Sequence, residues 1–210
     1  MRRKLRVTAA LGLVLAIPFA HAAGENAADA PKTSVSVTGF YYAMRDQSDF
    51  GVAVASLNRG ALHLEGRYNY EARDAGSLFV GWNLAGGEEV TFQVTPIVGG
   101  LFGAAHGVIP GVEASVAYRS VDAYIEAEYV ADSTNSADSY YYAWSELGWK
   151  PAEWLRLGLV GQRTRVVHTE RDLQRGLFAQ FFLGPATLGV YFFNPDSASR
   201  YVIGALGIQF

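Results

Sequence analysis

Charged and polar side chains recur at every second position over residues 62–71. In that run, LHLEGRYNYE, the polar residues alternate with apolar and aromatic ones and are His63, Glu65, Arg67, Asn69 and Glu71. Successive side chains of a β-strand point to opposite faces, so we expect these five to share one face. Acidic and basic groups at this spacing form ion pairs or line a hydrated surface.

The same alternation, continued along the chain, extends this polar face. The added residues are Asn83, Gln93, Glu113, Ser115, Arg119, Glu126, Glu128, Glu146, Arg156, Gln162, Gln180 and Gln209. Six carboxylates then face three guanidinium groups. We expect Arg67, Arg119 and Arg156 to bridge neighbouring glutamates, because buried charges must be paired or hydrated.

Catalysis would need a nucleophile or a base held by neighbouring groups. Beyond residue 22 the histidines are His63, His106 and His168. None of them lies in a G-x-S-x-G, H-E-x-x-H or Walker sequence, so we expect no enzyme activity and no metal or other cofactor. The chain has no cysteine, which excludes disulfides, thiolate metal sites and a cysteine-linked lipid anchor.

The elements that position these side chains are predicted to be β-strands in an all-β fold. Period-two alternation and turn residues predict twelve strands, over residues 34–45, 50–57, 61–72, 76–85, 89–98, 108–120, 121–132, 139–149, 153–167, 173–183, 186–193 and 200–210. Tight turns alternate with mostly longer loops. Ten strands is the alternative count. A water-soluble β-sandwich would share the alternation and the composition, which is 50% hydrophobic.

The two ends of the chain carry the signals that choose between these folds. Residues 1–22 read as a cleaved secretory signal, with a cationic head, a short apolar stretch and a small-x-small site at Ala20-His21-Ala22. Its removal takes away four cations and changes the formal net charge from −3 to −7. Residues 23–33 read as a flexible leader. In the final strand, alternate residues up to Phe210 share an apolar face.

With this signal and this last strand, the chain resembles the bacterial outer-membrane β-barrel proteins as a class, and no specific family among them. The resemblance implies a closed antiparallel up-and-down transmembrane β-barrel over residues 34–210, in the outer membrane of a Gram-negative cell. Apolar side chains would face lipid and polar ones the lumen. It also implies that Phe210 is a signal for the barrel-assembly machinery, and that both termini and the short turns are periplasmic. Nothing suggests a nucleic-acid partner, because no basic run follows residue 22.

Inside such a barrel, two interpretations of the polar face stay open. It is either a salt-bridged interior that conducts nothing or a narrow pore with a mild preference for cations. Aromatic residues of the same parity would narrow the bore: Phe40, Tyr42, Phe79, Tyr124, Tyr142 and Trp144. The glycine-rich residues 99–111 are either a bent strand pair or a loop folded into the mouth, with His106 as a lining group at a constriction.

Several residues are expected on the outer surface. Arg163, Arg165 and Arg175 point outward near the extracellular end, where they could bind lipopolysaccharide phosphates. Trp82, Trp149, Trp154 and Tyr141 lie near strand ends, as in an interfacial aromatic girdle. The predicted function is a channel for small polar or cationic solutes. A non-conducting structural or partner-binding barrel is the alternative, and a lipid-modifying enzyme using His168 or His106 is the third reading.

Overall fold

The computed structural model describes residues 32–45, 47–166 and 172–210. The predicted signal (residues 1–22) and nearly all of the predicted leader (residues 23–33) lie outside these ranges, as does His168. Among the described residues, no helix is long and apolar enough to span a bilayer. One short 3₁₀-helix, η1 (Ser136–Asp138), interrupts a fold that otherwise consists of strands.

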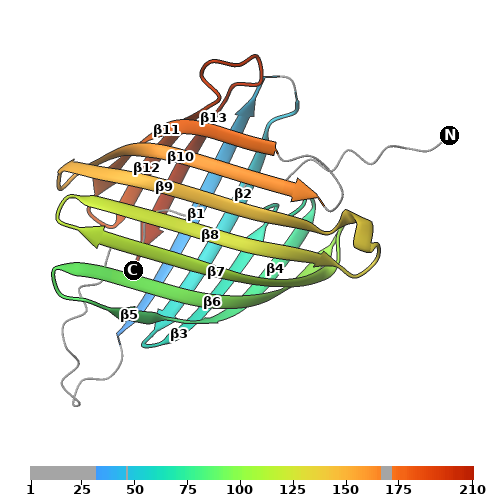
Figure 1. Cartoon of the computed structure of the whole chain (residues 1–210), viewed down its shortest axis with the longest axis horizontal. Helices are drawn as coiled ribbons and strands as arrows, with labels where there is room; N and C mark the ends of the chain where they lie inside the picture. Colours follow the sequence, from blue (N-terminus) through green and yellow to red (C-terminus); the bar gives the residue numbers. More distant parts are fainter. Residues whose placement is uncertain (1–31, 46, 167–171) are drawn as a thin grey trace.

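Thirteen strand segments follow one another along the chain (Figure 1). They are β1 (Thr33–Met44), β2 (Phe50–Arg59), β3 (Leu62–Tyr68), β4 (Ala75–Trp82), β5 (Leu84–Gly86), β6 (Val90–Gly103), β7 (Gly107–Tyr118), β8 (Val121–Asp132), β9 (Tyr140–Ala152), β10 (Leu155–Val166), β11 (Asp172–Leu183), β12 (Ala186–Phe193) and β13 (Tyr201–Gln209).

These segments form one closed antiparallel sheet. Each pairs with its neighbours in sequence, except that β4 and β5 both pair with β6 and together make a single strand of the wall. β1 pairs with both β2 and β13, which closes the cylinder. The result is a twelve-stranded β-barrel, which confirms the predicted fold class and strand number.

The barrel has two ends that differ in their connections. β1 begins and β13 finishes at one end, here called the terminal end, and the tight turns lie there too. The opposite end, here called the loop end, carries the connections after β1, β3, β6, β8, β10 and β12. The prediction of tight turns alternating with longer connections is therefore reproduced.

Most predicted strand bounds shift by a few residues, and three differences bear on the interior. The wall strand expected over residues 76–85 is broken at Asn83, whose side chain bonds inward to Asn58, Gln93 and Thr95. β6 and β7 pair without interruption from Val90↔Tyr118 to Leu101↔Gly107, so residues 99–111 form a strand pair. β3 stops at Tyr68, four residues before the predicted end.

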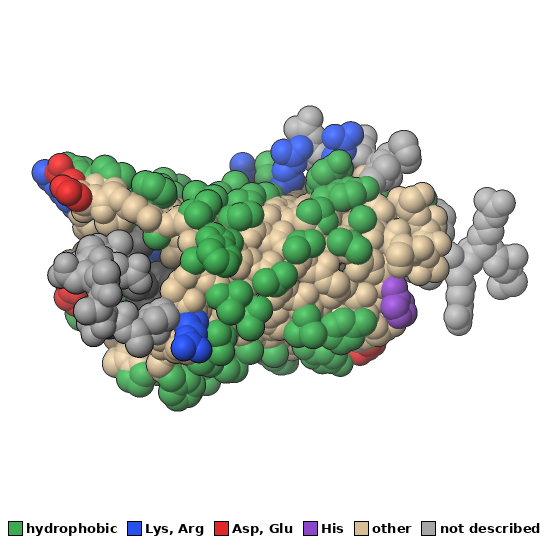
Figure 2. Space-filling model, turned by 90° about the horizontal axis from the view of Figure 1, so that it is seen from below, with side chains coloured by type: hydrophobic (Ala, Val, Ile, Leu, Met, Phe, Trp, Pro, Cys, Tyr) green, Lys and Arg blue, Asp and Glu red, His purple; other side chains and the backbone are tan. Residues whose placement is uncertain are grey.

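Apolar side chains cover the outside of the wall. Leu78, Leu159 and Leu206 are more than half exposed, and they belong to a much larger exposed apolar set that reaches all round the barrel. Figure 2 shows such side chains spread over the face in view, with a group of Lys and Arg side chains along its upper edge and a few other charged groups elsewhere at the margins. A surface of this kind is stable against lipid, since contiguous apolar patches of that extent are rare on water-soluble monomers.

Alternation places the opposite set of side chains inside. On β13, Tyr201, Ile203 and Ala205 are buried, whereas Val202 and Leu206 are exposed. The six aromatic residues expected to narrow the bore are all buried. Trp82, Trp149, Trp154 and Tyr141 lie on the outer surface, each more than half exposed.

Candidate functional site

The interior contains a cavity of about 510 Å³ in the half of the barrel nearest the terminal end. Exposed Glu153, Gly184 and Phe210 form part of its rim. Its wall carries hydroxyl and amide groups, including Ser36 and Asn58, from β1 and β2. We call this cavity the chamber. His63, Glu65 and Glu113 line its inner part, so that a solute in the chamber meets two carboxylates and an imidazole.

Next to the chamber, one arginine lies among five carboxylates. The Arg67 guanidinium is fully buried and bonds to Glu65 at 2.5 Å, Glu128 at 2.8 Å and both Glu71 and Glu126 at 3.3 Å. Glu113 is further away, at 3.7 Å. We call this group the Arg67 cluster. It contains more negative than positive formal charge, which makes the lumen acidic.

A second charged group lies near the terminal end, on β8 to β11. The Arg156 guanidinium bonds to Asp122 and Glu146, and its Nη1 also donates to the Gln180 amide oxygen at 2.8 Å. Gly148 leaves room for it, because a Cβ at that position would collide with the guanidinium. Here two carboxylates share one cation and a neutral amide, so this group is closer to charge balance.

At the loop end, residues 69–74 form an inward segment that places Tyr70 and Glu71 in the lumen, while Arg73 and Asp74 stay exposed. Asn69 has a φ of +59°, which breaks the alternation of β3 and directs Tyr70 and Glu71 into the barrel. The Tyr70 hydroxyl donates to Glu126 at 2.6 Å, and the Tyr140 hydroxyl donates to the Glu71 carbonyl oxygen at 2.6 Å. These bonds tie the inward segment to β8 and β9.

Aromatic side chains complete the filling on the other side of the lumen. Trp144 packs against Tyr191 and Phe193 with ring centroids 5.9 and 5.4 Å apart, and Phe193 stacks on Tyr201 at 4.9 Å. Trp144, Tyr191 and Phe193 are fully buried. The middle of the lumen is therefore packed with side chains, and open space is concentrated in the chamber.

Most of the predicted lumen residues lie inside the barrel. His63, Glu65, Arg67, Glu71, Glu113, Glu126, Glu128, Glu146, Arg156, Gln162 and Gln180 are buried. Asn83 and Gln93 are half-buried and bonded to each other, and Gln209 lines the chamber. The structure brings Glu65, Glu71, Glu113, Glu126 and Glu128 together around Arg67.

Three predicted positions were wrong. Asn69 is a turn residue that bonds to the Gly51 carbonyl and the Asp74 amide, because its positive φ takes it off the inner face. Arg119 lies in the turn after β7 with φ +54°, where its mostly exposed side chain is 3.7 Å from Glu89. His106 is exposed on the β6–β7 turn and lines no constriction, since the two strands stay paired almost to that turn.

Sequence reasoning missed two groups that matter. Asp122 was not among the predicted inward residues, yet it is the first inward residue of β8 and binds Arg156. Asp122 has the same parity as Glu126 and Glu128, so the alternation along this strand already indicated that it points inward. Tyr70 was placed on the lipid face, and only the positive φ at Asn69 reverses it. Asp122 brings the buried acids to seven, against the two buried arginines, Arg67 and Arg156, among the described residues.

The outward arginines lie on two adjacent strands near the loop end. Arg163 and Arg165 are exposed on β10, where buried Gln162 and Thr164 alternate with them. Arg175 is exposed on β11 and donates to Asp196 at 2.6 Å. That hydrogen bond holds the pKa of the Asp196 carboxyl below its ordinary value. The three cations therefore face outward, and one of them already has an acidic partner.

Comparison with known proteins finds likeness in structure but not in sequence. No protein-family model matches the chain, and no curated protein matches it. The solved structure of the KdgM porin, and that of the same porin in complex with disordered oligogalacturonate, each match with a TM-score of 0.60 at 11% identity, covering 83% of this chain and 98% of that chain. The translocator domain of the autotransporter NalP from Neisseria meningitidis matches with a TM-score of 0.39 at 10% identity. At these identities the likeness concerns the fold, which is the closed barrel of bacterial outer-membrane proteins.

Proposed function

We propose that the protein is a narrow, porin-like channel of the bacterial outer membrane that admits small polar or cationic solutes. The apolar outer wall and the barrel fold shared with the KdgM porin support the membrane location. The observation that carries the proposal is the chamber, which is reached from the terminal end and leads to the carboxylates of the Arg67 cluster. Rings of acidic side chains favour cations over anions in a pore.

Passage through the whole barrel requires the inward segment to move. Tyr70 and Tyr140 hold it against β8 and β9 through two hydrogen bonds of 2.6 Å. A neutral hydrogen bond contributes about 1 kcal/mol net, and one to a carboxylate about 1.5–3 kcal/mol. Glu71 of this segment is also bonded to Arg67 and Ser77. Several bonds must therefore break before the lumen opens, and the channel is expected to have a low conductance.

A second candidate is a barrel that takes solutes into the chamber and conducts nothing. Complete burial of Trp144, Arg156 and Tyr191 favours it, because these side chains occupy the lumen where a wide pore would hold water. In this case the charged groups stabilise the interior in place of an apolar core.

Conductance across planar bilayers separates the two candidates. The wild-type barrel is expected to show small, cation-selective steps in a potassium chloride gradient. Y70A/Y140A is expected to conduct more, because it releases the inward segment. The matched control is Y68A/Y141A, which removes two exposed tyrosines from neighbouring positions on the outer surface. If the wild type does not conduct and Y70A/Y140A does, the result supports the closed barrel. If neither conducts, the channel proposal is rejected.

The partners follow from the same location, and we infer them as part of this proposal. Residues 1–22 direct export and are removed, and Phe210 presents the last strand to the barrel-assembly machinery. The terminal end then faces the periplasm and the loop end faces the outside. Arg163, Arg165 and Arg175 lie at the level of lipopolysaccharide phosphates, which guanidinium groups bind through charge-assisted hydrogen bonds.

A further inference from the structure

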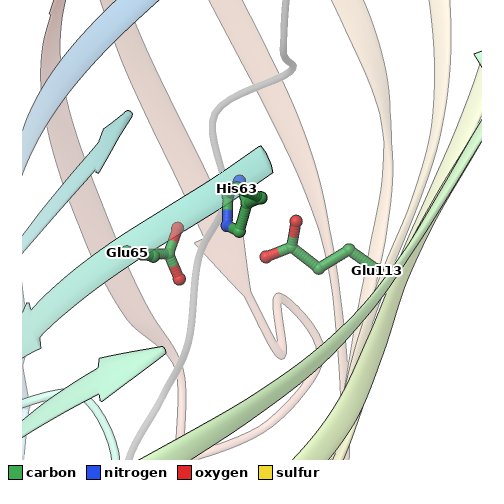
Figure 3. Close-up of side chains that lie close together, drawn as sticks. All are labelled: His63, Glu65 and Glu113. Atoms are coloured by element: carbon green, nitrogen blue, oxygen red, sulfur yellow. The ribbon is translucent and has the colours of Figure 1, made fainter. Parts of the chain in front are cut away.

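Three potential ligand groups converge at the inner part of the chamber. One nitrogen of His63 and one carboxylate oxygen each from Glu65 and Glu113 all lie within 4.8 Å of one another. His63 and Glu65 come from β3, and Glu113 comes from β7. Figure 3 shows the Glu113 carboxylate and the Glu65 carboxylate on either side of the His63 ring. No sequence motif predicts that these three residues meet, because β3 and β7 are some fifty residues apart in the chain.

The His63 ring is held in the form that a metal ligand requires. The Asn58 amide oxygen accepts from Asn83 at 2.8 Å and lies 2.9 Å from His63 Nδ1. Because this oxygen only accepts, Nδ1 carries a proton, and in the neutral ring Nε2 is then the nitrogen with the lone pair. The ring is 2% exposed, and Nε2 is buried without a hydrogen-bond partner. A buried nitrogen lone pair with no partner is unfavourable unless something binds it.

Glu113 shows the same deficiency. Its Oε1 has no hydrogen-bond partner, and the nearest cation is Arg67 Nη2 at 3.7 Å. Arg67 bonds to four other carboxylates through Nε and Nη1, and its Nη2, which faces Glu113, also has no hydrogen-bond partner. The Arg67 cluster thus has four formal negative charges in excess if all five acids are ionised. Buried charges of one sign need a counter-charge.

We propose that His63, Glu65 and Glu113 bind a divalent transition-metal ion of the zinc type. One imidazole nitrogen and two carboxylate oxygens suit zinc and its neighbours, whereas magnesium and calcium prefer oxygen ligands alone. Zinc bonds of about 2.0–2.2 Å in a tetrahedron place ligand atoms roughly 3.4 Å apart. The three ligand atoms lie within 4.8 Å of one another, so side-chain adjustments on the order of 1 Å would bring them to that spacing. The fourth position faces the chamber, which all three residues line. The ion lowers the excess negative charge whether or not the barrel conducts.

Metal titration of the folded, tag-free barrel tests the site. The protein is purified in detergent, stripped with a chelator and titrated with zinc by calorimetry, and with cobalt by visible absorption. We expect one ion per barrel, with weaker response to magnesium or calcium. His63→Ala and Glu113→Gln should each abolish the cobalt spectrum or weaken zinc binding by at least tenfold. Asn58→Ala removes the partner that orients the ring and should weaken zinc binding roughly 10–100-fold.

The matched control is Glu153→Gln, which removes a carboxylate from the rim of the same chamber but outside the three-residue site. It should bind zinc as the wild type does. Folding of each variant is checked by heat-modifiable migration. If His63→Ala does not fold, the isosteric variant Glu113→Gln alone tests whether the site binds metal. Absence of binding to the folded wild type would overturn the proposal, and so would unchanged binding in Glu113→Gln. Either result leaves the channel proposal standing, because conductance is measured without added metal.

Discussion

At the scale of the residue, burial separates side chains of identical type. Arg119 and Arg156 were both predicted to bridge acidic groups inside the barrel. Arg156 is fully buried between Asp122 and Glu146, whereas Arg119 is about three-quarters exposed beside Glu89. Exposed ion pairs contribute little, since water screens them and both side chains lose entropy. Removing the cation from a buried pair leaves carboxylates without compensation.

We therefore expect Arg156→Gln to destabilise the barrel by about 3–5 kcal/mol. The glutamine keeps part of the volume, so the loss comes mainly from the uncompensated Asp122 and Glu146. Unfolding by urea in lipid vesicles, followed by tryptophan fluorescence, measures the change. Arg119→Gln is the control and should have no measurable effect. If the two variants have equal free energies of unfolding, Arg156 does not stabilise the barrel in this way.

At the scale of the element, closure depends on the seam between β1 and β13. The register runs from Ser36↔Gln209 to Met44↔Tyr201. Beyond it, the Phe210 amide donates to the Val35 carbonyl at 2.8 Å, and the Val35 amide donates to Phe210 at 3.1 Å. The Phe210 ring itself is 75% exposed. Its backbone therefore closes the seam, while its ring is free to be recognised.

Phe210→Ala separates these two roles, because it keeps both backbone bonds and removes the ring. We expect severalfold less barrel in the outer membrane of producing cells, measured by heat-modifiable migration. The stability of the variant refolded in detergent should be unchanged. Ile208→Ala removes another exposed apolar side chain from the same face of β13 and is the control. If both variants assemble alike, Phe210 is an ordinary lipid-facing residue.

At the scale of the whole molecule, the distribution of charge indicates an orientation. Much of the wall seen in Figure 2 is apolar. The outward cations Arg163, Arg165 and Arg175 lie on β10 and β11, toward the loop end. A cation facing hydrocarbon at the midplane costs roughly 2–4 kcal/mol, and far less near an interface. We therefore propose that lipid phosphates compensate Arg163, Arg165 and Arg175.

Replacement of these three arginines by glutamine should lower the amount of lipopolysaccharide that copurifies with the barrel. The variant loses the charge-assisted hydrogen bonds to phosphate. The measurement is the amount of lipopolysaccharide per amount of purified protein. Arg59→Gln together with Arg119→Gln is the control, since both residues lie at the terminal end. Equal loss in the control, or no loss in the triple variant, would reject the proposed contact.

The sequence alone determined the two faces of the sheet, whereas twelve strands and a closed barrel were predictions that the structure confirms. Alternation is a local property, because each residue of a strand has only two directions to point. For the same reason Glu126, Glu128 and Glu146 could be assigned to the interior without any knowledge of their neighbours. That the other face meets lipid was an expectation from the resemblance to outer-membrane barrels, and the exposed apolar wall agrees with it.

Only the tertiary structure decided what the interior side chains do to one another. One backbone angle at Asn69 reverses the alternation and turns Tyr70 into the lumen. Which carboxylates share Arg67 depends on barrel curvature, which brings β3, β7 and β8 together across the lumen. The same curvature sets His63 beside Glu113. Such contacts are distant in sequence and leave no periodic trace, so they appear only when the sheet closes.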